Sequence, residues 1–332
     1  MRVLILGGTQ AAGPYIAREL DRRGHRVTVF HRGIHEADLP DAVRHVHGDR
    51  RVPGALAELA AALRPDAVVD MLALRETDAL AVIDAFPAVR RAVFVSSGDV
   101  YEVFQAVRRG QPSPQPYPIP EDAPLRRPTV LFPNDPEYDK VPVEEAVRRA
   151  HGERGFPGVI LRFPAVYGPG AGTREWYWIK RALDRRPFIA LPDGGLNIFH
   201  RGHAANVARA VALAVEEDAA VGRAYNVGDT RVYTVRQITD MVAEAMDHWW
   251  EVVSVPALAW TAGTPYSVSP HIIYDLTRIR RELGYEDAVD PETGLVETVR
   301  WLAAHPPEMT SALARAAFDY EAEDRVIQRY RL

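Results

Sequence analysis

The segment with the most specific chemical signal is Gly7-Gly8-Thr9-Gln10-Ala11-Ala12-Gly13. An apolar run, Val3–Leu6, precedes it, and a stretch with apolar residues at helical spacing, Pro14–Arg23, follows it. A glycine turn between a strand and a helix surrounds an anion with backbone N–H groups and the positive end of the helix dipole. This context predicts a phosphate cradle for a dinucleotide, although Gln10 stands where the usual fingerprint has its middle glycine.

The elements that position this turn alternate along the first half of the chain. Apolar runs between helical stretches are typical of a parallel sheet covered on both faces. Right-handed crossovers then predict an α/β fold with a doubly wound parallel sheet, the Rossmann architecture. Further strands are expected at residues 27–30, 43–47, 67–70, 92–95 and 159–163, and helices at 56–63, 77–86 and 141–150.

Proline interrupts the alternation after about Val107. Nine prolines fall within residues 111–136, which predicts a long irregular loop, either a lid or a surface excursion. We expect residues 1–172 to form the dinucleotide-binding domain. Residues 173–332 are expected to form mainly a smaller C-terminal α/β substrate lobe, with some segments returning to the first domain. In this second part we expect a strand near 224–227 and helices near 204–216, 235–246, 276–283, 292–304 and within 311–332.

Composition restricts the function classes. The chain has 332 residues, a formal net charge of -5 and no cysteine, which excludes disulfides and thiolate zinc sites and gives no general attraction to nucleic acid. No apolar run approaches the roughly 20 residues that span a bilayer, and the chain starts with a strand rather than a signal peptide, so a cytoplasmic location is expected. His45 and His47 share an expected strand, but no histidine or carboxylate cluster has metal-ligand spacing, and no metal is predicted.

Five local motifs follow the glycine turn in order. They are Gly48-Asp49, Ser96-Ser97-Gly98-Asp99-Val100-Tyr101, Arg162–Gly170, Tyr225–Gly228 and Tyr274–Tyr285. Through them, roughly residues 1–304 resemble the extended short-chain dehydrogenase/reductase superfamily, in its NAD(P)-dependent epimerase/dehydratase branch. The Gly-Gly-Thr start and His31-Arg32-Gly33 resemble an atypical subgroup that includes chloroplast RNA-binding relatives.

The resemblance implies a catalytic serine, tyrosine and lysine. Ser97 corresponds to the serine, but the family spacing Tyr-x-x-x-Lys is broken because the chain reads Tyr138-Asp139-Lys140-Val141-Pro142. Proline fits only the first turn of a helix, so we expect a helix that begins near Lys140, with Asp139 as its N-cap and Tyr138 before it. The predicted catalytic set is Ser97, Tyr138 and Lys140; the alternative is that Tyr138 is only a loop aromatic and the site is depleted.

The predicted cofactor is NADP, with NAD as the alternative. Gly7 allows the tight turn, and Gly13 lets the helix pack close to the strand. The second strand ends in His31-Arg32 rather than in a carboxylate, and an arginine at this position can bind a 2′-phosphate. The predicted cofactor-binding residues are Gly7, Thr9, Gln10, Gly13, Arg32, Asp49 and Lys140.

The substrate side is less specific. Dehydratases of the family carry a carboxylate pair after the catalytic hydroxyl, whereas Gly98 and Asp99 stand here, so we interpret Asp99 mainly as a solvated turn residue. Arg201 either holds an anion or is simply exposed, and the cluster Trp176-Tyr177-Trp178 either lines a pocket or packs in the core. The predicted substrate-binding residues are Ser97, Asp99, Tyr167, Trp176 and Arg201.

These expectations describe an NAD(P)-dependent oxidoreductase or epimerase that acts on a carbonyl or hydroxyl carbon of a small molecule or sugar derivative and that could assemble as a homodimer. The alternative is a cofactor-binding protein without catalysis, such as a redox sensor or an RNA-associated relative. Arg108-Arg109 and Arg126-Arg127 are the local features that favour RNA. We interpret them as solvated surface charge and expect no nucleic-acid partner.

Overall fold

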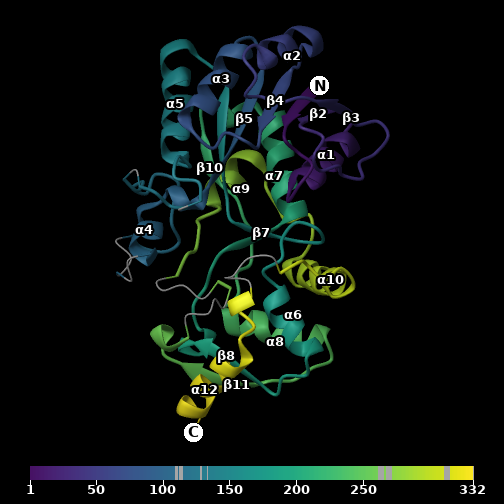
Figure 1. The fold of residues 1–332 in the computed structure, drawn as a ribbon. Helices are drawn as coiled ribbons and strands as arrows, with labels where there is room; N and C mark the ends of the chain where they lie inside the picture. Colours follow the sequence, from purple (N-terminus) through teal and green to yellow (C-terminus); the bar gives the residue numbers. More distant parts are fainter. Residues whose placement is uncertain are drawn as a thin grey trace.

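The structure, a computed structural model, describes residues 1–108, 111, 115–127, 129–132, 134–260, 265–266, 271–309 and 315–331. Within these residues a parallel sheet has seven strands in the order β10-β6-β5-β4-β1-β2-β3, and it forms the upper part of the molecule in Figure 1. The doubly wound fold is therefore confirmed. The strands are β1 (Arg2–Leu6), β2 (Arg26–His31), β3 (Arg44–His47), β4 (Ala67–Asp70), β5 (Arg91–Ser97), β6 (Gly158–Phe163) and β10 (Ala224–Asn226).

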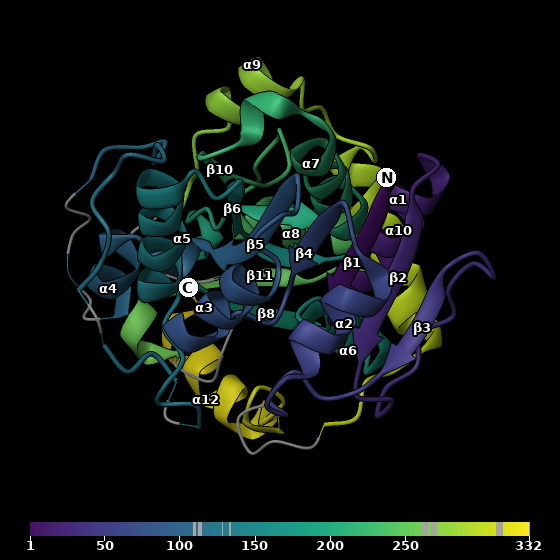
Figure 2. The same cartoon turned by 90° about the horizontal axis from the view of Figure 1, so that it is seen from above.

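Helices cover both faces of this sheet, as Figure 2 shows from above. Along β1, Val3 and Ile5 enter one core while Leu4 and Leu6 enter the other, because successive side chains of a strand point to opposite faces. Both faces are buried, which explains why the strands read as continuous apolar runs. One face carries α1 (Gly13–Arg22), α7 (Ala204–Glu216) and α9 (Thr277–Leu283); the other carries α2 (Ala55–Leu63), α3 (Glu76–Ala85) and α5 (Lys140–Arg154).

A smaller lobe lies below the sheet in Figure 1 and contains the C-terminus. Its centre is a parallel pair, β8 (Phe188–Pro192) with β11 (Glu251–Val255), and a second pair, β7 (Ala165–Tyr167) with β9 (Arg201–His203), lies between the two parts. Its helices are α6 (Trp176–Leu183), α8 (Val235–Ala245), α10 (Pro291–Ala304) and α12 (Tyr320–Tyr330). Short 3₁₀ turns occur in both parts of the molecule: η1 (Gly98–Val100) and η3 (Asp218–Ala220) in the sheet domain, and η2 (Asp193–Gly195) and η4 (Ala257–Ala259) in the smaller lobe.

Two elements from the second half of the chain, α7 and β10, pack with the sheet domain. Helix α7 packs against α1 and buries Val207, Val211 and Val215 in the same core as Ile16. Strand β10 pairs with β6 and completes the sheet. These elements join the sheet domain because their apolar side chains extend the core that α1 contributes to. The sequence analysis expected such returning segments without naming them.

The proline-rich segment is irregular where it is described, but it is attached to the sheet domain. Helix α4 (Glu102–Arg108), which the sequence did not predict, leads into it. Ile119 forms an isolated bridge to Tyr274, and Leu125 forms one to Tyr101. Four of its nine prolines, Pro112, Pro114, Pro128 and Pro133, lie outside the described residues.

No helix in the described ranges is long and apolar enough to cross a membrane.

Candidate active site

The glycine turn has the backbone that a phosphate cradle requires. Gly7 and Gly8 have φ values of +96° and +95°, a region that side chains rarely adopt. A Cβ atom on Gly13 would lie 2.5 Å from the Cα and carbonyl carbon of Gly8, so α1 begins in direct contact with the turn. The N-cap residue Ala12 supplies no side-chain cap. No side chain therefore competes with an anion at the start of α1, although the Gly13 N–H already donates to the carbonyl of Gln10 and Pro14 has no N–H.

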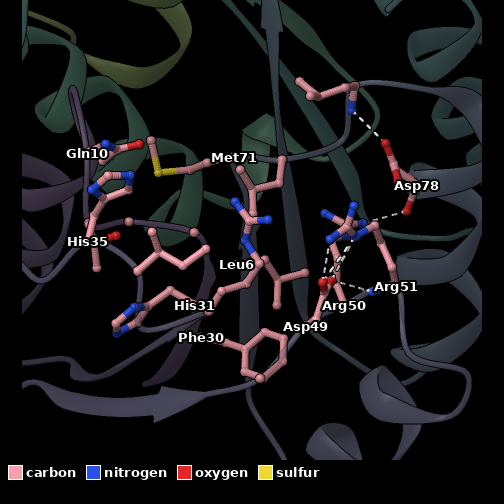
Figure 3. A pocket seen from close by; sticks show the side chains of 18 of the residues that line it. Leu6, Gln10, Phe30, His31, His35, Asp49, Arg50, Arg51, Met71 and Asp78 are labelled. Carbon is pink, nitrogen blue, oxygen red and sulfur yellow. Dashed lines mark hydrogen bonds and ion pairs between the residues drawn. The ribbon is translucent and has the colours of Figure 1, made fainter. Parts of the chain in front are cut away.

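The turn opens into a cleft of about 440 Å³. Five of the predicted cofactor-binding residues line it: Gly7, Thr9, Gln10, Arg32 and Asp49. The sequence analysis missed further lining residues, namely Arg50, Arg51, Arg75 and His35. Figure 3 shows Asp49, Arg50 and Arg51 grouped on one side of the cleft. For Arg50 and Arg51 the sequence offered a signal, because these two arginines directly follow the Gly48-Asp49 motif.

The charges in this cleft are partly paired. The Asp49 carboxylate lies 2.6 Å from the Arg51 guanidinium, whose hydrogen bonds lower the pKa of Asp49 to about 2. Arg50 is nearly buried and donates to the Asp70 carboxylate (2.7 Å) and the Asp78 carbonyl (2.8 Å), which ties β4 to α3. Arg32 and Arg51 are exposed, so they remain accessible to a bound phosphate.

Substitution of Gly13 by alanine tests the cradle. The added Cβ would overlap backbone atoms of Gly8, so we expect a loss of about 1–3 kcal/mol in the free energy of unfolding and loss of dinucleotide binding. Gly152→Ala is the matched control, because nothing lies within 4 Å of its Cβ position in α5, and it should stabilise the protein by about 0.5–1 kcal/mol. Urea denaturation and NADPH fluorescence titration measure both effects. Wild-type NADPH affinity in Gly13→Ala would contradict this assignment of the cradle.

A second group of side chains lies where β5 ends. The Tyr138 hydroxyl donates to Asp99 Oδ2 at 2.8 Å, and the Ser97 hydroxyl accepts the Asp99 backbone N–H at 3.2 Å. Burial, together with the Asp99 charge, raises the pKa of Tyr138, and burial raises the pKa of Asp99. Asp99 is only 5% exposed, so the interpretation of a solvated turn residue was wrong. The broken spacing therefore does not separate Tyr138 from Ser97.

Helix α5 explains how Tyr138 reaches this position. It begins at Lys140, and the Asp139 side chain accepts the N–H of Val141 at 3.0 Å, as the proline position predicted. The Asp139 N–H donates to the carbonyl of Leu74 at 3.0 Å. Since Leu74 lines the dinucleotide cleft, this bond places the Ser97–Asp99–Tyr138 group beside that cleft.

Lys140 is buried next to the group of Ser97, Asp99 and Tyr138. Its ammonium donates to the carbonyls of Ala73 (2.6 Å) and Val95 (2.9 Å) and lies 5.9 Å from the centre of the Tyr138 ring. Burial lowers its pKa to about 8, against the opposing charges of Asp70 and Asp99. Two of its three N–H groups thus bind backbone carbonyls, and Lys140 is buried and is not among the residues that line the cleft, so the contact with a cofactor ribose that the resemblance implied stays a prediction.

Gly98 has a steric reason to lack a side chain. A Cβ atom there would lie 1.9 Å from the hydroxyl of Tyr274, which is itself buried and stacked between Tyr101 and His200. No carboxylate fits at position 98 beside this tyrosine. The structure thus gives a physical basis for the missing half of the dehydratase carboxylate pair.

Described parts of the proline-rich segment pack on the same group. Arg126 is buried and donates to the Asp99 carbonyl and to the Asp139 carboxylate, each at 2.8 Å. The Phe132 ring lies 5.0 Å from the Tyr138 ring, edge to face. The interpretation of Arg126 as solvated charge was therefore wrong, whereas Arg127 is exposed. Arg109 and the side chain of Arg108 lie outside the described residues.

The remaining predicted substrate residues lie elsewhere, in the interior. Tyr167 is fully buried and donates to Asp229 at 2.8 Å. Trp176 belongs to the core of the smaller lobe. Arg201 is buried and pairs with Glu175 at 3.1 Å, so its interpretation as an exposed arginine was wrong. The structure does not bring Tyr167, Trp176 or Arg201 to Ser97, so the proposed site does not include them.

The parallel sheet, the glycine turn and the adjacent serine–tyrosine pair together define a dinucleotide-dependent enzyme of the oxidoreductase or epimerase type. Comparison with known proteins agrees: residues 3–228 match the NAD dependent epimerase/dehydratase family. The chain therefore belongs to this family, and the catalytically depleted alternative is not favoured.

Individual relatives and solved structures show what the chain resembles. It is 30% identical over 269 residues to 2′-dehydrokanamycin reductase of Streptomyces kanamyceticus, covering 79% of this chain and 71% of the relative. It is 23% identical over 259 residues to chloroplast stem-loop binding protein of 41 kDa b of Arabidopsis thaliana, covering 74% and 63%. UDP-glucose-4-epimerase from Stenotrophomonas maltophila, solved with bound NAD, superposes with a TM-score of 0.73 at 18% identity, covering 92% of this chain and 98% of that one. That last likeness shows the fold.

Proposed function

We propose that this protein is an NADP(H)-dependent reductase that converts a carbonyl group of a sugar derivative into a hydroxyl group. The observation that carries the proposal is the hydrogen-bonded group of Ser97, Asp99 and Tyr138 next to the dinucleotide cleft. The steric block at Gly98 argues against dehydration. The 30% identity to 2′-dehydrokanamycin reductase supports reduction of a keto-sugar within a glycoside.

The chain's own residues would supply orientation and the proton. The nicotinamide, when bound, supplies the hydride. Ser97 would donate a hydrogen bond to the substrate oxygen. Tyr138 holds its proton at neutral pH because burial and Asp99 raise its pKa, so it can act as general acid toward that oxygen. Asp99 would orient the phenol, because its Oδ2 accepts the hydrogen bond of the Tyr138 hydroxyl. The tyrosinate would then recover its proton from water, since Tyr138 is only partly buried. Lys140 acts as a positioning residue through its charge, which stabilises a transient negative charge on Tyr138.

The basic end of the cleft supports NADP over NAD. Arg32 follows β2, at the position that faces the adenosine ribose in folds of this type. Glu36 is the first carboxylate after this strand, but its oxygens lie 3.3 Å from His45 and 3.0 Å from His47. Asp49 is neutralised by Arg51. Asp49 is thus paired with an arginine, and the Glu36 oxygens are directed at the histidines rather than at Arg32, which is exposed and available to a 2′-phosphate.

The test of the cofactor is a pair of dissociation constants for NADPH and NADH. Arg32→Ala should raise the dissociation constant of NADPH about 10- to 100-fold, the cost of one charged hydrogen-bonding group, and leave that of NADH within about threefold. Arg26→Ala is the control, because Arg26 begins the same strand and is exposed away from the cleft. Tighter binding of NADH than of NADPH by the wild-type protein would overturn the NADP assignment.

A further inference from the structure

A second cluster of potential ligands lies at the edge of the sheet. The parallel register pairs His31 with His47 and Val29 with His45. Residues two apart on a strand share a face, so these three imidazoles gather on one side of β2 and β3. Their ring centroids lie 5.2 Å apart for His31 and His45 and 4.7 Å apart for His31 and His47. The sequence analysis missed this cluster because His31 comes from a different strand.

The segment between the two strands adds a carboxylate. Glu36 reaches back so that its oxygens lie 3.0 Å from His47 Nε2, 3.3 Å from His45 Nδ1 and 3.9 Å from His31 Nε2. One ligand atom from each of the four residues lies within 4.8 Å of all the others. Ligands of tetrahedral zinc, at about 2.0–2.1 Å from the metal, are about 3.3 Å apart. The contacts of 2.9–3.9 Å between neighbouring members are close to this spacing, and the limit of 4.8 Å means that side-chain rotations would have to draw the widest pairs together around one ion.

Hydrogen bonds alone do not satisfy the cluster. His31 Nδ1 accepts the N–H of Gly33 at 3.2 Å, which places the His31 proton on Nε2, toward His45 Nδ1 at 2.9 Å. His45 Nδ1 then acts as an acceptor, yet it also faces the Glu36 carboxylate at 3.3 Å. Two acceptors that face each other repel, whereas a cation between them would attract both.

We propose that His31, Glu36, His45 and His47 form a binding site for a divalent transition metal, with Zn²⁺ as the best match. Three imidazole nitrogens and one carboxylate oxygen form a donor set suited to zinc rather than to Mg²⁺ or Ca²⁺, which prefer oxygen ligands. On binding, His31 carries its proton on Nδ1, and the contact with the Gly33 amide is released. His31 is buried, whereas Glu36 and His47 are about half exposed, so an ion can enter from solvent.

The site would join the segment after β2 to β3. Arg32 and His35 belong to this segment, precede Glu36 and line the dinucleotide cleft. Figure 3 shows His31 and His35 among the lining side chains. The metal would thus fix the segment that carries Arg32. The metal site itself does not depend on the proposed reductase function.

Calorimetric titration of untagged, chelator-treated protein with ZnCl₂ tests the site. We expect one equivalent of Zn²⁺ to bind, and the double variant His45→Gln/His47→Gln to bind at least about tenfold more weakly. His35→Gln is the matched control, because this histidine lies in the same segment but outside the cluster, and it should bind zinc like the wild type. Absence of stoichiometric binding by the wild type, or unchanged affinity in the double variant, would overturn the proposal.

A second measurement uses the wild-type protein alone, so it decides the matter even if the double variant does not fold. Co²⁺ in a tetrahedral site of nitrogen and oxygen ligands absorbs visible light much more strongly than hydrated Co²⁺. We expect this intense absorption to appear with one equivalent of CoCl₂ and to disappear when Zn²⁺ is added. Only the weak spectrum of hydrated Co²⁺ would contradict the site.

Discussion

Replacement of Tyr138 by phenylalanine is expected to lower kcat about 10²–10⁴-fold, the usual contribution of a general acid. The phenol is the donor in the 2.8 Å hydrogen bond to Asp99 and lies beside Ser97, so its removal takes away the proton that the substrate oxygen would receive. Cofactor affinity should change little, since Tyr138 is not among the residues that line the dinucleotide cleft. Steady-state kinetics with a keto-sugar substrate and NADPH titration separate the two effects.

Tyr233→Phe is the control for this experiment. Tyr233 is partly buried in the smaller lobe, and its hydroxyl donates to Glu292 at 2.9 Å, away from Ser97 and Asp99. This variant should retain the wild-type kcat. If Tyr138→Phe also turned over at the wild-type rate, the proton would come from another group, and the catalytic assignment of Tyr138 would be wrong.

Glu144→Ala is expected to cost about 3–5 kcal/mol in the free energy of unfolding. The fully buried Glu144 carboxylate accepts two hydrogen bonds from Arg162, at 2.9 and 2.7 Å, and one from Ser96 at 2.7 Å. Burial opposes the charge on Glu144, but Arg162 more than compensates, so the pKa of Glu144 is lowered. Removal of the carboxylate would leave the buried Arg162 charge without its charged partner on β6, where Arg162 pairs in register with Ser96 of β5.

Glu145→Ala is the matched control, because Glu145 is the next residue of the same helix and is exposed. It should change stability by no more than about 0.5 kcal/mol. Urea denaturation of both variants gives the comparison. A loss below about 1 kcal/mol in Glu144→Ala, the range of an exposed ion pair, would mean that Arg162 finds other compensation in the core.

The features that could be predicted from the sequence are those set by interactions within one short segment of the chain. The apolar runs of β1 and β4 and the glycine turn identify a covered parallel sheet, because few other folds bury strands on both faces. The unusual start of α5 at Lys140 was also predictable, since Pro142 tolerates only a first-turn position.

Features that depend on contacts between distant residues were not predictable. The burial of Asp99 depends on Tyr138 and Arg126. The space that a side chain at position 98 would need is filled by Tyr274, which lies far along the chain. Likewise, the histidine cluster depends on the register between β2 and β3. No periodicity or spacing within one segment contains this information.

Reduction of a carbonyl carbon by NADPH at Ser97 and Tyr138, as we propose, requires that a hydride pass from the nicotinamide to the substrate. The most direct measurement uses NADPH deuterated at C4 of the nicotinamide with a panel of keto-glycosides, headed by 2′-dehydrokanamycin, and mass spectrometry of the products. We expect one deuterium on the carbinol carbon of at least one product, and at least about 10²-fold less labelled product with Tyr138→Phe over the same time. Binding of NADPH without any transfer of deuterium across the panel would contradict the proposed reduction and would favour a cofactor-binding protein without redox activity.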